Sequence, residues 1–322
     1  RACQMNIAFL SKTEINIRYL THAMVPHRMT ICRSRTELLR AIPEVEVLVV
    51  QNQGFARGTV NAECLSAAKK LRLIQHHGVT CDVTDVGAAA KLGIPVATIR
   101  GQNSRSVAEH AFYLMLALAR KSRQAQRLMH EGRMGELECV ELEGKTLCVV
   151  GAGTIGKMLA KMAKGFGMTV VGVTKTGAAQ DALGAGFDAV HAIRDLHRAL
   201  AGAEFVVLAL PLNEETLNLM DADEFRAMKR GAMLVNVSRG PHVNRDALRQ
   251  ALIGNGIGGY ATDVFWEEPA DTQDPLLQDE RVLITPHMGG KSIEAIQRSV
   301  AAIRQNIERL AAGEPLLNIV SA

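Results

Sequence analysis

The strongest constraint on the fold of this chain is an alternation of short apolar runs with helix-like segments, which continues over almost all of its 322 residues. The apolar runs are rich in β-branched residues, and the segments between them carry apolar residues at helical spacing. Such an alternation is typical of parallel βαβ units, in which helices cover both faces of a sheet. In the first part of the chain, strands are predicted at 5–10, 46–50, 71–77 and 94–99, with helix-like segments at 34–41 and 59–70.

A second alternation follows a long helix that is predicted to start near Ser104. Its strands are predicted at 145–151, 168–173, 205–210, 232–237, 258–264 and 281–287, and a final helix is expected at 292–312. A chain of this length is too long for one ordinary hydrophobic core. We therefore predict an α/β protein with two doubly wound (Rossmann-like or flavodoxin-like) domains, parallel sheets and a cleft between them. One domain is expected to comprise residues 5–103 plus 286–322, and the other residues 104–285.

The composition excludes several classes of protein. Lys plus Arg exceed Asp plus Glu by only 37 − 33 = 4, so neither a nucleic acid nor an anionic membrane is an expected partner. The six cysteines are scattered without a C-x-x-C pair, which favours reduced thiols over disulfides or a zinc site. No apolar run is long enough to span a bilayer, and the N-terminus lacks the layout of a secretory signal. A cytoplasmic protein is expected.

The stretch "LCVVGAGTIGKMLA" contains Gly151, Gly153 and Gly156 in G-x-G-x-x-G spacing, directly after a predicted strand and before a predicted helix. In that context the first glycine permits a tight turn, the second lets the backbone approach a pyrophosphate, and the third lets the helix pack on the strand. The helix N-terminus offers unpaired N–H groups to phosphates. The motif therefore predicts a dinucleotide-binding site in residues 104–285.

The next predicted strand ends at Thr174, where this motif usually carries an acid that holds the ribose hydroxyls. No carboxylate follows the strand; Lys175 does. A lysine suits the 2′-phosphate of NADP(H) through a charge-assisted contact. We therefore expect NADP(H) to be favoured, with NAD(H) possible. The alternative is that Lys175 is a solvated surface residue and that the selectivity is slight.

Seven blocks of the sequence resemble, in order, those of the D-isomer-specific 2-hydroxyacid dehydrogenase family, including its glyoxylate and hydroxypyruvate reductases. The blocks are "HHGVTCDVTDVGAAAKLGIPVA", "NSRSVAEHAFYLMLALAR", "LEGKTLCVVGAGTIG", "LPLNEETLNLMD", "LVNVSRG", "ATDVFWEEP" and "ITPHMGG". The resemblance implies hydride transfer between a nicotinamide cofactor and a small 2-keto or D-2-hydroxy acid. It also implies that residues 5–103 plus 286–322 form the substrate domain and that the protein is a homodimer.

Carried over by this resemblance, the catalytic residues are Arg239, Glu268 and His287. Their chemistry suits the reaction, because a carbonyl oxygen gains negative charge as the hydride arrives. Histidine is a proton donor near neutral pH, a carboxylate orients its ring, and a guanidinium polarises the carbonyl. Glu267 is adjacent to Glu268, and the choice between them rests on the position of Glu268 before Pro269 in the family block.

The resemblance implies further contacts. The expected substrate-binding residues are Gly78, Val79, Thr80 and Asn103; the expected cofactor-binding residues are Gly151, Gly153, Thr154, Ile155, Gly156, Thr174, Lys175, Leu210, Pro211, Thr216, Val237, Ser238 and Asp263. No metal is expected, because adjacent strand residues such as His76 and His77 point to opposite faces. Arg100 and Lys291 depart from the family pattern, and they are interpreted either as surface residues or as cations that favour a doubly acidic substrate.

Two other functions stay open. Some members of the family are nucleotide-sensing corepressors that retain the same three residues, so a binding protein is one alternative. A dehydrogenase of another small anion, such as phosphite, is the second. Formate enzymes generally carry glutamine beside the histidine, and Glu268 argues against that variant.

Overall fold

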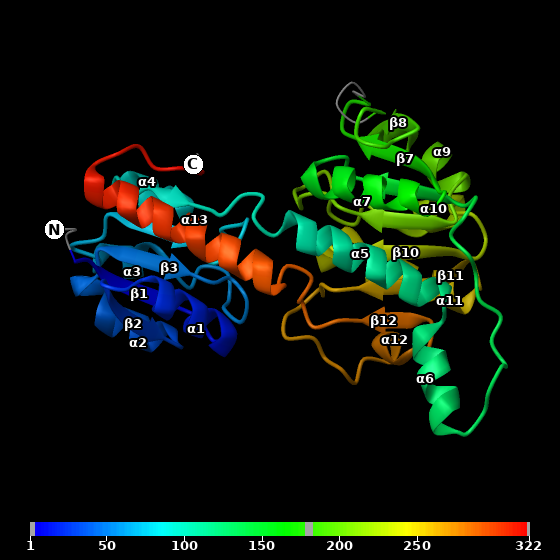
Figure 1. Ribbon diagram of the computed structural model, residues 1–322, viewed down its shortest axis with the longest axis horizontal. Helices are drawn as coiled ribbons and strands as arrows, with labels where there is room; N and C mark the ends of the chain where they lie inside the picture. The colour runs from blue at the N-terminus through cyan, green and yellow to red at the C-terminus, as the bar shows by residue number, and fades with distance from the viewer. Residues whose placement is uncertain (1–3, 178–182, 321–322) are drawn as a thin grey trace. The chain divides into compact units, whose positions relative to one another are not determined.

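The computed structural model describes residues 4–177 and 183–320, which form two compact units. The first unit contains the described residues up to Asn103 and those from Lys291 onward, and the second contains Ser104–Gly290. Each unit is a parallel sheet with helices on both faces (Figure 1). The predicted fold class, two doubly wound α/β domains with parallel sheets, is confirmed.

The division differs from the expected one at residues 286–290, which belong to the second unit. The reason is local. The backbone N–H groups of Met288 and Gly289 donate to the carboxylate of Asp263 at 2.8 and 2.7 Å. These bonds fasten the segment after the last strand to the second unit.

The first unit has the strand order β2-β1-β3-β4-β5, all parallel. Its strands are β1 (Asn6–Leu10), β2 (Arg28–Cys32), β3 (Val47–Val50), β4 (Leu73–His76) and β5 (Val96–Ala97). Helices α1 (Glu14–Ala23) and α13 (Ile293–Ala312) pack on one face. Helices α2 (Arg35–Ala41), α3 (Ala62–Ser66) and α4 (Val86–Lys91) pack on the other. Helix α13 comes from the far end of the chain, and its apolar stripe covers Ile7 and Phe9 of β1.

The second unit has the strand order β12-β11-β10-β9-β6-β7-β8, again all parallel. Its strands are β6 (Thr146–Val150), β7 (Thr169–Thr174), β8 (Ala189–Ala192), β9 (Phe205–Leu208), β10 (Ala232–Asn236), β11 (Ile257–Thr262) and β12 (Val282–Ile284). Helices α5 (Ser104–Ala119) and α7 (Thr154–Gly165) cover one face. Helices α9 (Leu196–Ala201), α10 (Ala222–Ala227), α11 (Arg245–Ile253) and α12 (Pro275–Gln278) cover the other, and α6 (Ser122–His130) follows α5.

Two strands and the length of one helix differ from the sequence expectation. Strands β2 and β8 were not predicted; both lie at sheet edges, where mixed burial leaves no continuous apolar run. The helix expected at 59–70 is only Ala62–Ser66. It begins there because the side chain of Asn61 accepts a hydrogen bond from the N–H of Cys64 and caps the first turn.

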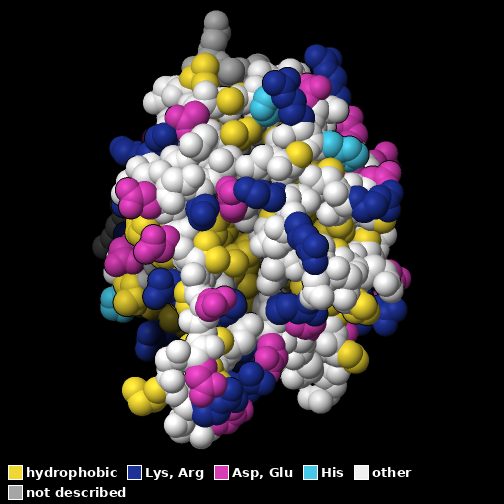
Figure 2. Space-filling model, turned by 90° about the vertical axis from the view of Figure 1, so that its right-hand side faces the viewer, with side chains coloured by type: hydrophobic (Ala, Val, Ile, Leu, Met, Phe, Trp, Pro, Cys, Tyr) yellow, Lys and Arg dark blue, Asp and Glu magenta, His cyan; other side chains and the backbone are white. Residues whose placement is uncertain are grey.

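The surface carries charges of both signs. In the space-filling view onto the second unit, basic and acidic side chains are interspersed, with no field of one sign (Figure 2). None of the described helices combines the length and hydrophobicity needed to cross a bilayer. The five cysteines within the described residues are free thiols; Cys3 lies outside them.

A buried amide in α13 ties the C-terminal segment to the first sheet. Asn306 is 2% exposed, and its Nδ2 donates to Gln75 Oε1 at 2.8 Å and to the carbonyl of Leu317 at 3.0 Å. Its Oδ1 accepts from the N–H of Leu317 at 2.8 Å. All three bonds lie within the first unit.

We expect Asn306→Ala to lower the free energy of unfolding by about 1–3 kcal/mol, because buried partners lose their hydrogen bonds. Urea denaturation followed by circular dichroism measures the change. The control is Gln305→Ala, an exposed neighbour on the same helix, which should change stability little. Equal effects of the two substitutions would contradict this account of the buried amide.

Candidate active site

The glycine turn lies where the strand order of the second sheet reverses. From β6 the chain proceeds to β7 and β8 on one side, whereas β9 and the later strands lie on the other. In sheets of this kind ligands bind beyond the carboxyl ends of the strands at such a reversal. A Cβ on Gly151 would lie 2.3 Å from the carbonyl oxygen of Ala209, and one on Gly156 would lie 2.1 Å from that of Gly151. Only glycine allows these two approaches.

Gly153 differs, because a Cβ there would meet no atom within 4 Å. It is the N-cap of α7, without a side-chain cap and without an acid in the first turn. Thr154 and Ile155 open the helix, so their N–H groups lie at its positive end. Open space in front of an uncapped helix N-terminus fits a pyrophosphate. The residues present therefore fit a dinucleotide cofactor.

Strand β7 ends in a tight turn, and Lys175 in this turn forms an ion pair. Thr174 Oγ1 accepts a hydrogen bond from the N–H of Gly177 at 2.9 Å. The side chain of Lys175 is 75% exposed, and its Nζ lies 2.7 Å from an oxygen of Glu215. Lys175 therefore has a carboxylate partner, although its side chain is largely exposed to solvent.

Two buried side chains, those of Ser238 and His242, contact the backbone of the loop after β9. Ser238 Oγ donates to the carbonyl of Leu208 and accepts from the N–H of Leu210, both at 2.9 Å. The ring nitrogens of His242 lie 2.9 Å from the carbonyl oxygen of Thr216 and 3.2 Å from that of Leu210. Burial lowers the pKa of His242, although both carbonyls oppose that shift. The tautomer of the ring decides which of the two carbonyls accepts, because a neutral imidazole has a single N–H.

Several of the predicted cofactor-binding residues lie in this loop or contact it. Thr216 Oγ1 donates to the carbonyl of Pro211 at 2.9 Å, which closes the loop on itself. Val237, directly after β10, is 9% exposed. His242 was not predicted, and no motif in the sequence singles it out.

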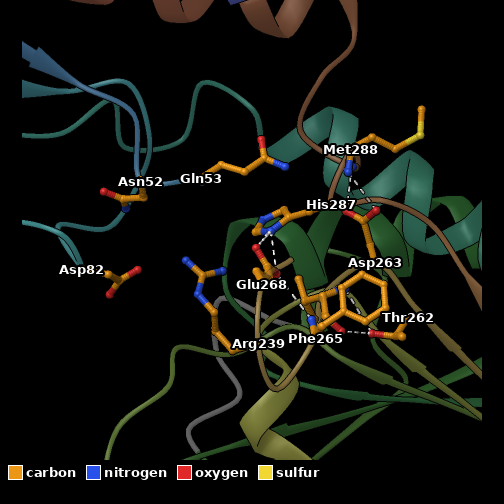
Figure 3. A network of polar contacts seen from close by, with 12 residues as sticks. Asn52, Gln53, Asp82, Arg239, Thr262, Asp263, Phe265, Glu268, His287 and Met288 are labelled. Carbon is orange, nitrogen blue, oxygen red and sulfur yellow. Dashed lines mark hydrogen bonds and ion pairs between the residues drawn. The ribbon is translucent and has the colours of Figure 1, made fainter. Parts of the chain in front are cut away.

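A carboxylate–imidazole pair lies at the carboxyl end of the same sheet. Both oxygens of Glu268 lie 2.8 Å from His287 Nδ1, and the two side chains face one another (Figure 3). Burial would raise the pKa of Glu268. The contacts with His287, the N–H of Phe265 and the charge of Arg239 together hold that pKa below its usual value. Glu268 is therefore ionised at neutral pH, and it is Glu268 rather than the exposed Glu267 that contacts the ring.

Arg239 lies near this pair because Gly240, which follows it, lets its segment pass close to the segment that carries Glu268. A Cβ on Gly240 would lie 2.1 Å from the backbone of Phe265, so the two segments pass in close contact. The carbonyl of Arg239 accepts from Asn236 Nδ2 at 2.8 Å. The Nη1 atom of Arg239 donates to the carbonyl of Ser238 at 2.7 Å. The structure thus brings the three predicted catalytic side chains to one end of the second sheet.

A buried carboxylate holds the segment that carries His287. Asp263 is 4% exposed and accepts from Thr285 Oγ1 at 2.7 Å as well as from Met288 and Gly289. Burial alone would raise the pKa of Asp263. Hydrogen bonds from His110, Thr285 and the two N–H groups lower it instead. The contact of Asp263 with a nicotinamide carboxamide stays a prediction.

The contacts of His110 were not predicted from the sequence. Its Nε2 lies 2.9 Å from Thr285 Oγ1 and 3.4 Å from Asp263 Oδ1. A signal was present, because Glu109 and His110 interrupt an otherwise apolar helix. A polar side chain on the buried side of such a helix needs a partner.

The predicted substrate loop follows β4 in the first unit. The backbone N–H groups of Gly78 and Val79 meet no acceptor within the part of the chain that the structure describes. Asn52 Nδ2 donates to the carbonyl and the hydroxyl of Thr80, both at 2.8 Å, and so holds the loop. Asn103 is half-buried at the end of this unit.

The other polar candidates of the first unit are also placed. His76 contacts Asn52 Oδ1 at 3.1 Å and Thr84 Oγ1 at 3.0 Å, and burial lowers its pKa to about 4. Arg100 is exposed, whereas Lys291 is half-buried and donates to Gln53 Oε1 at 2.6 Å. Among the described residues, no three His, Cys, Asp or Glu side chains gather as a metal site would require.

Comparison with known proteins gives matches over almost the whole chain. Residues 112–289 match the sequence model of the "D-isomer specific 2-hydroxyacid dehydrogenase, NAD binding domain". A D-3-phosphoglycerate dehydrogenase of Archaeoglobus fulgidus is 36% identical over 290 residues, which are 89% of this chain and 54% of that protein. A glyoxylate reductase of Korarchaeum cryptofilum is 35% identical over 294 residues, 89% of this chain and 86% of that protein.

The chain thus spans about half the length of the phosphoglycerate dehydrogenase that it matches, and most of the length of the glyoxylate reductase. Among solved structures, the apo form of D-lactate dehydrogenase from Escherichia coli superimposes with a TM-score of 0.86. It is 25% identical, and the match covers 98% of this chain and 100% of that one.

We expect Asp263→Asn to lower the free energy of unfolding at pH 7 by about 1.5–3 kcal/mol, because an amide cannot accept from all of these donors. The lowered pKa makes the stabilisation fully present above the ordinary aspartate pKa of 3.8 and lost as the pH falls below it. The difference between wild type and variant should therefore be constant from about pH 7 to 5 and shrink below about pH 4. Urea unfolding at each pH measures it. Glu267→Gln, a change of an exposed acid nearby, is the control, and a pH-independent difference down to about pH 3 would refute the account.

Proposed function

Because the chain belongs to the D-isomer specific 2-hydroxyacid dehydrogenase family, a family of NAD-dependent oxidoreductases, we propose that it interconverts a small 2-keto acid and the D-2-hydroxy acid. The observation that carries this proposal is the imidazole of His287 with both oxygens of Glu268 at 2.8 Å, beside the guanidinium of Arg239. Such a set supplies a proton donor and a cation to an oxygen that gains charge.

Each side chain has a distinct part in the proposed reaction. A nicotinamide nucleotide held at the turn of Gly151, Gly153 and Gly156 would supply or accept the hydride at C2 of the substrate. His287 gives a proton from Nε2 to the carbonyl oxygen in the reductive direction and takes it back in the oxidative direction. Glu268 holds Nδ1, which fixes the orientation of the ring and leaves Nε2 to face the substrate. Arg239 polarises the carbonyl and pairs with the substrate carboxylate.

The carboxylate of the substrate is proposed to bind the loop of Gly78, Val79 and Thr80, with Asn103 as a further polar contact. The N–H groups of Gly78 and Val79 meet no acceptor among the described residues, which supports this role, since backbone donors are fixed and cannot lose their proton. We propose a small 2-keto acid such as glyoxylate or hydroxypyruvate, in line with the similarity to a glyoxylate reductase.

For the cofactor, we propose NADP(H) from Thr174 and Lys175, with NAD(H) also accepted. The absence of a carboxylate directly after β7 supports this preference. A cytoplasmic homodimer is part of the same proposal, which rests on the family alone. The other contacts proposed for the nucleotide are those of the cofactor-binding residues given above.

The test is steady-state oxidation of NADPH and NADH with a panel of 2-keto acids, together with reduction of both oxidised nucleotides by phosphite. Turnover of a small 2-keto acid supports the proposal. Nucleotide binding without turnover of any member of the panel would favour a nucleotide sensor, and turnover of phosphite alone would favour a dehydrogenase of that anion.

His287→Ala should lower kcat about 10²–10⁴-fold, the usual contribution of a general acid–base residue. His130→Ala, a change on the exposed side of α6, is the control and should leave kcat near that of wild type. Glu268→Gln and Glu267→Gln form a second matched pair, of which only the first should lower kcat. Near-normal turnover of His287→Ala would remove this residue from the mechanism.

A further inference from the structure

Lys175 has a carboxylate partner from a different loop. Glu215 lies after β9, and its Oε1 and Oε2 are 2.9 and 2.7 Å from Lys175 Nζ. The strand that ends at Thr174 lacks the acid that such a nucleotide site usually carries there. Glu215, forty residues after Lys175, therefore places a carboxylate near the end of β7.

The turn that carries Glu215 is held by its own side chains. Asn213 Oδ1 accepts from the N–H of Glu215 at 3.0 Å and from the N–H of Thr216 at 3.1 Å. Thr216 Oγ1 closes the turn onto Pro211, and buried His242 contacts the carbonyl of Thr216 from below. These contacts hold the backbone at Glu215, and the Glu215 side chain contacts Lys175.

We propose that Glu215 is a specificity-determining residue for the cofactor, which competes with the 2′-phosphate of NADP(H) for Lys175 and so limits the preference for NADP(H). This inference rests on the proposed function, because it assumes that the nucleotide binds at the glycine turn. With NAD(H), the ribose carries a neutral hydroxyl at this position, which does not compete with Glu215 for the ammonium group of Lys175.

The charges set the size of the effect. A phosphate on Lys175 would stand within a few ångströms of Glu215, since both would contact one ammonium group. Like unit charges about 4 Å apart in water change an equilibrium constant about fivefold, and a phosphate carries nearly two charges. Removing the charge of Glu215 should therefore tighten NADPH binding about 5–50-fold and change NADH binding less than about threefold.

The neighbouring Glu214 provides a matched control. It is exposed like Glu215, has no partner among the described residues, and its replacement by Gln makes the same change in net charge. A general effect of charge would appear in both variants, whereas competition for Lys175 would appear in only one.

The experiment is fluorescence titration of NADPH and NADH with wild type, Glu215→Gln, Glu214→Gln, Lys175→Ala and the double variant Lys175→Ala/Glu215→Gln. Thermal unfolding checks that each variant is folded. We expect Glu215→Gln alone to tighten NADPH binding, and the gain to disappear when Lys175 is absent. The gain should also decrease at high salt, because both groups are exposed.

The outcomes separate the two levels of the proposal. Binding of both nucleotides by wild type with equal ratios in Glu215→Gln and Glu214→Gln overturns the role of Glu215 and leaves the proposed function standing. A gain that persists without Lys175 overturns the competition. No binding of either nucleotide by wild type overturns both this inference and the proposed function.

Discussion

The interaction on which the site depends is the burial of one carboxylate, that of Asp263 at the end of β11. An ionised carboxylate away from water is unfavourable unless donors surround it. Three of its donors, Thr285 Oγ1 and the N–H groups of Met288 and Gly289, lie on the segment after β12. These three bonds hold the backbone of the segment, in which His287 adopts a φ of 52°, uncommon for a residue with a side chain. Glu268 therefore contacts the ring of a histidine whose backbone is held in place.

The parallel sheet of the second unit brings these groups to one edge. Because every strand runs the same way, the residues that follow β6, β7, β9, β10, β11 and β12 share the carboxyl end of the sheet. Two glycines then allow backbone to pass backbone where a side chain would clash. Gly151 lies against Ala209, and Gly240 lies against Phe265. The nucleotide turn and the carboxylate–imidazole pair are thus consequences of the same strand order.

Sequence reasoning succeeded where the signal is local. The glycine spacing and the apolar runs predicted the fold class and the turn at Gly151, since a strand, a tight turn and a helix leave their marks within about twenty residues. It failed for the edge strands β2 and β8, because half-exposed strands carry a weak periodicity. Spacing alone could not choose between Glu267 and Glu268, which are adjacent.

Contacts between side chains far apart in the sequence could not be predicted from the sequence either. Nothing near Lys175 in the sequence indicates Glu215, and nothing near Asp263 indicates His110. Such partners depend on which loops the topology brings together. The interruption of the apolar helix by His110 showed only that a polar partner was needed, and the fold identifies which one.

The return of α13 to the first sheet has a consequence for the order of synthesis. Ile7 and Phe9 of β1 are covered by a helix that begins at Ile293, whereas every residue of the second unit lies in one continuous stretch. On the ribosome, the second unit can complete its core first, while the part of the first sheet that α13 covers stays open until nearly three hundred residues of chain have emerged. During that interval a chaperone can bind the uncovered apolar residues, and a chain cut before α13 would leave them without this helix.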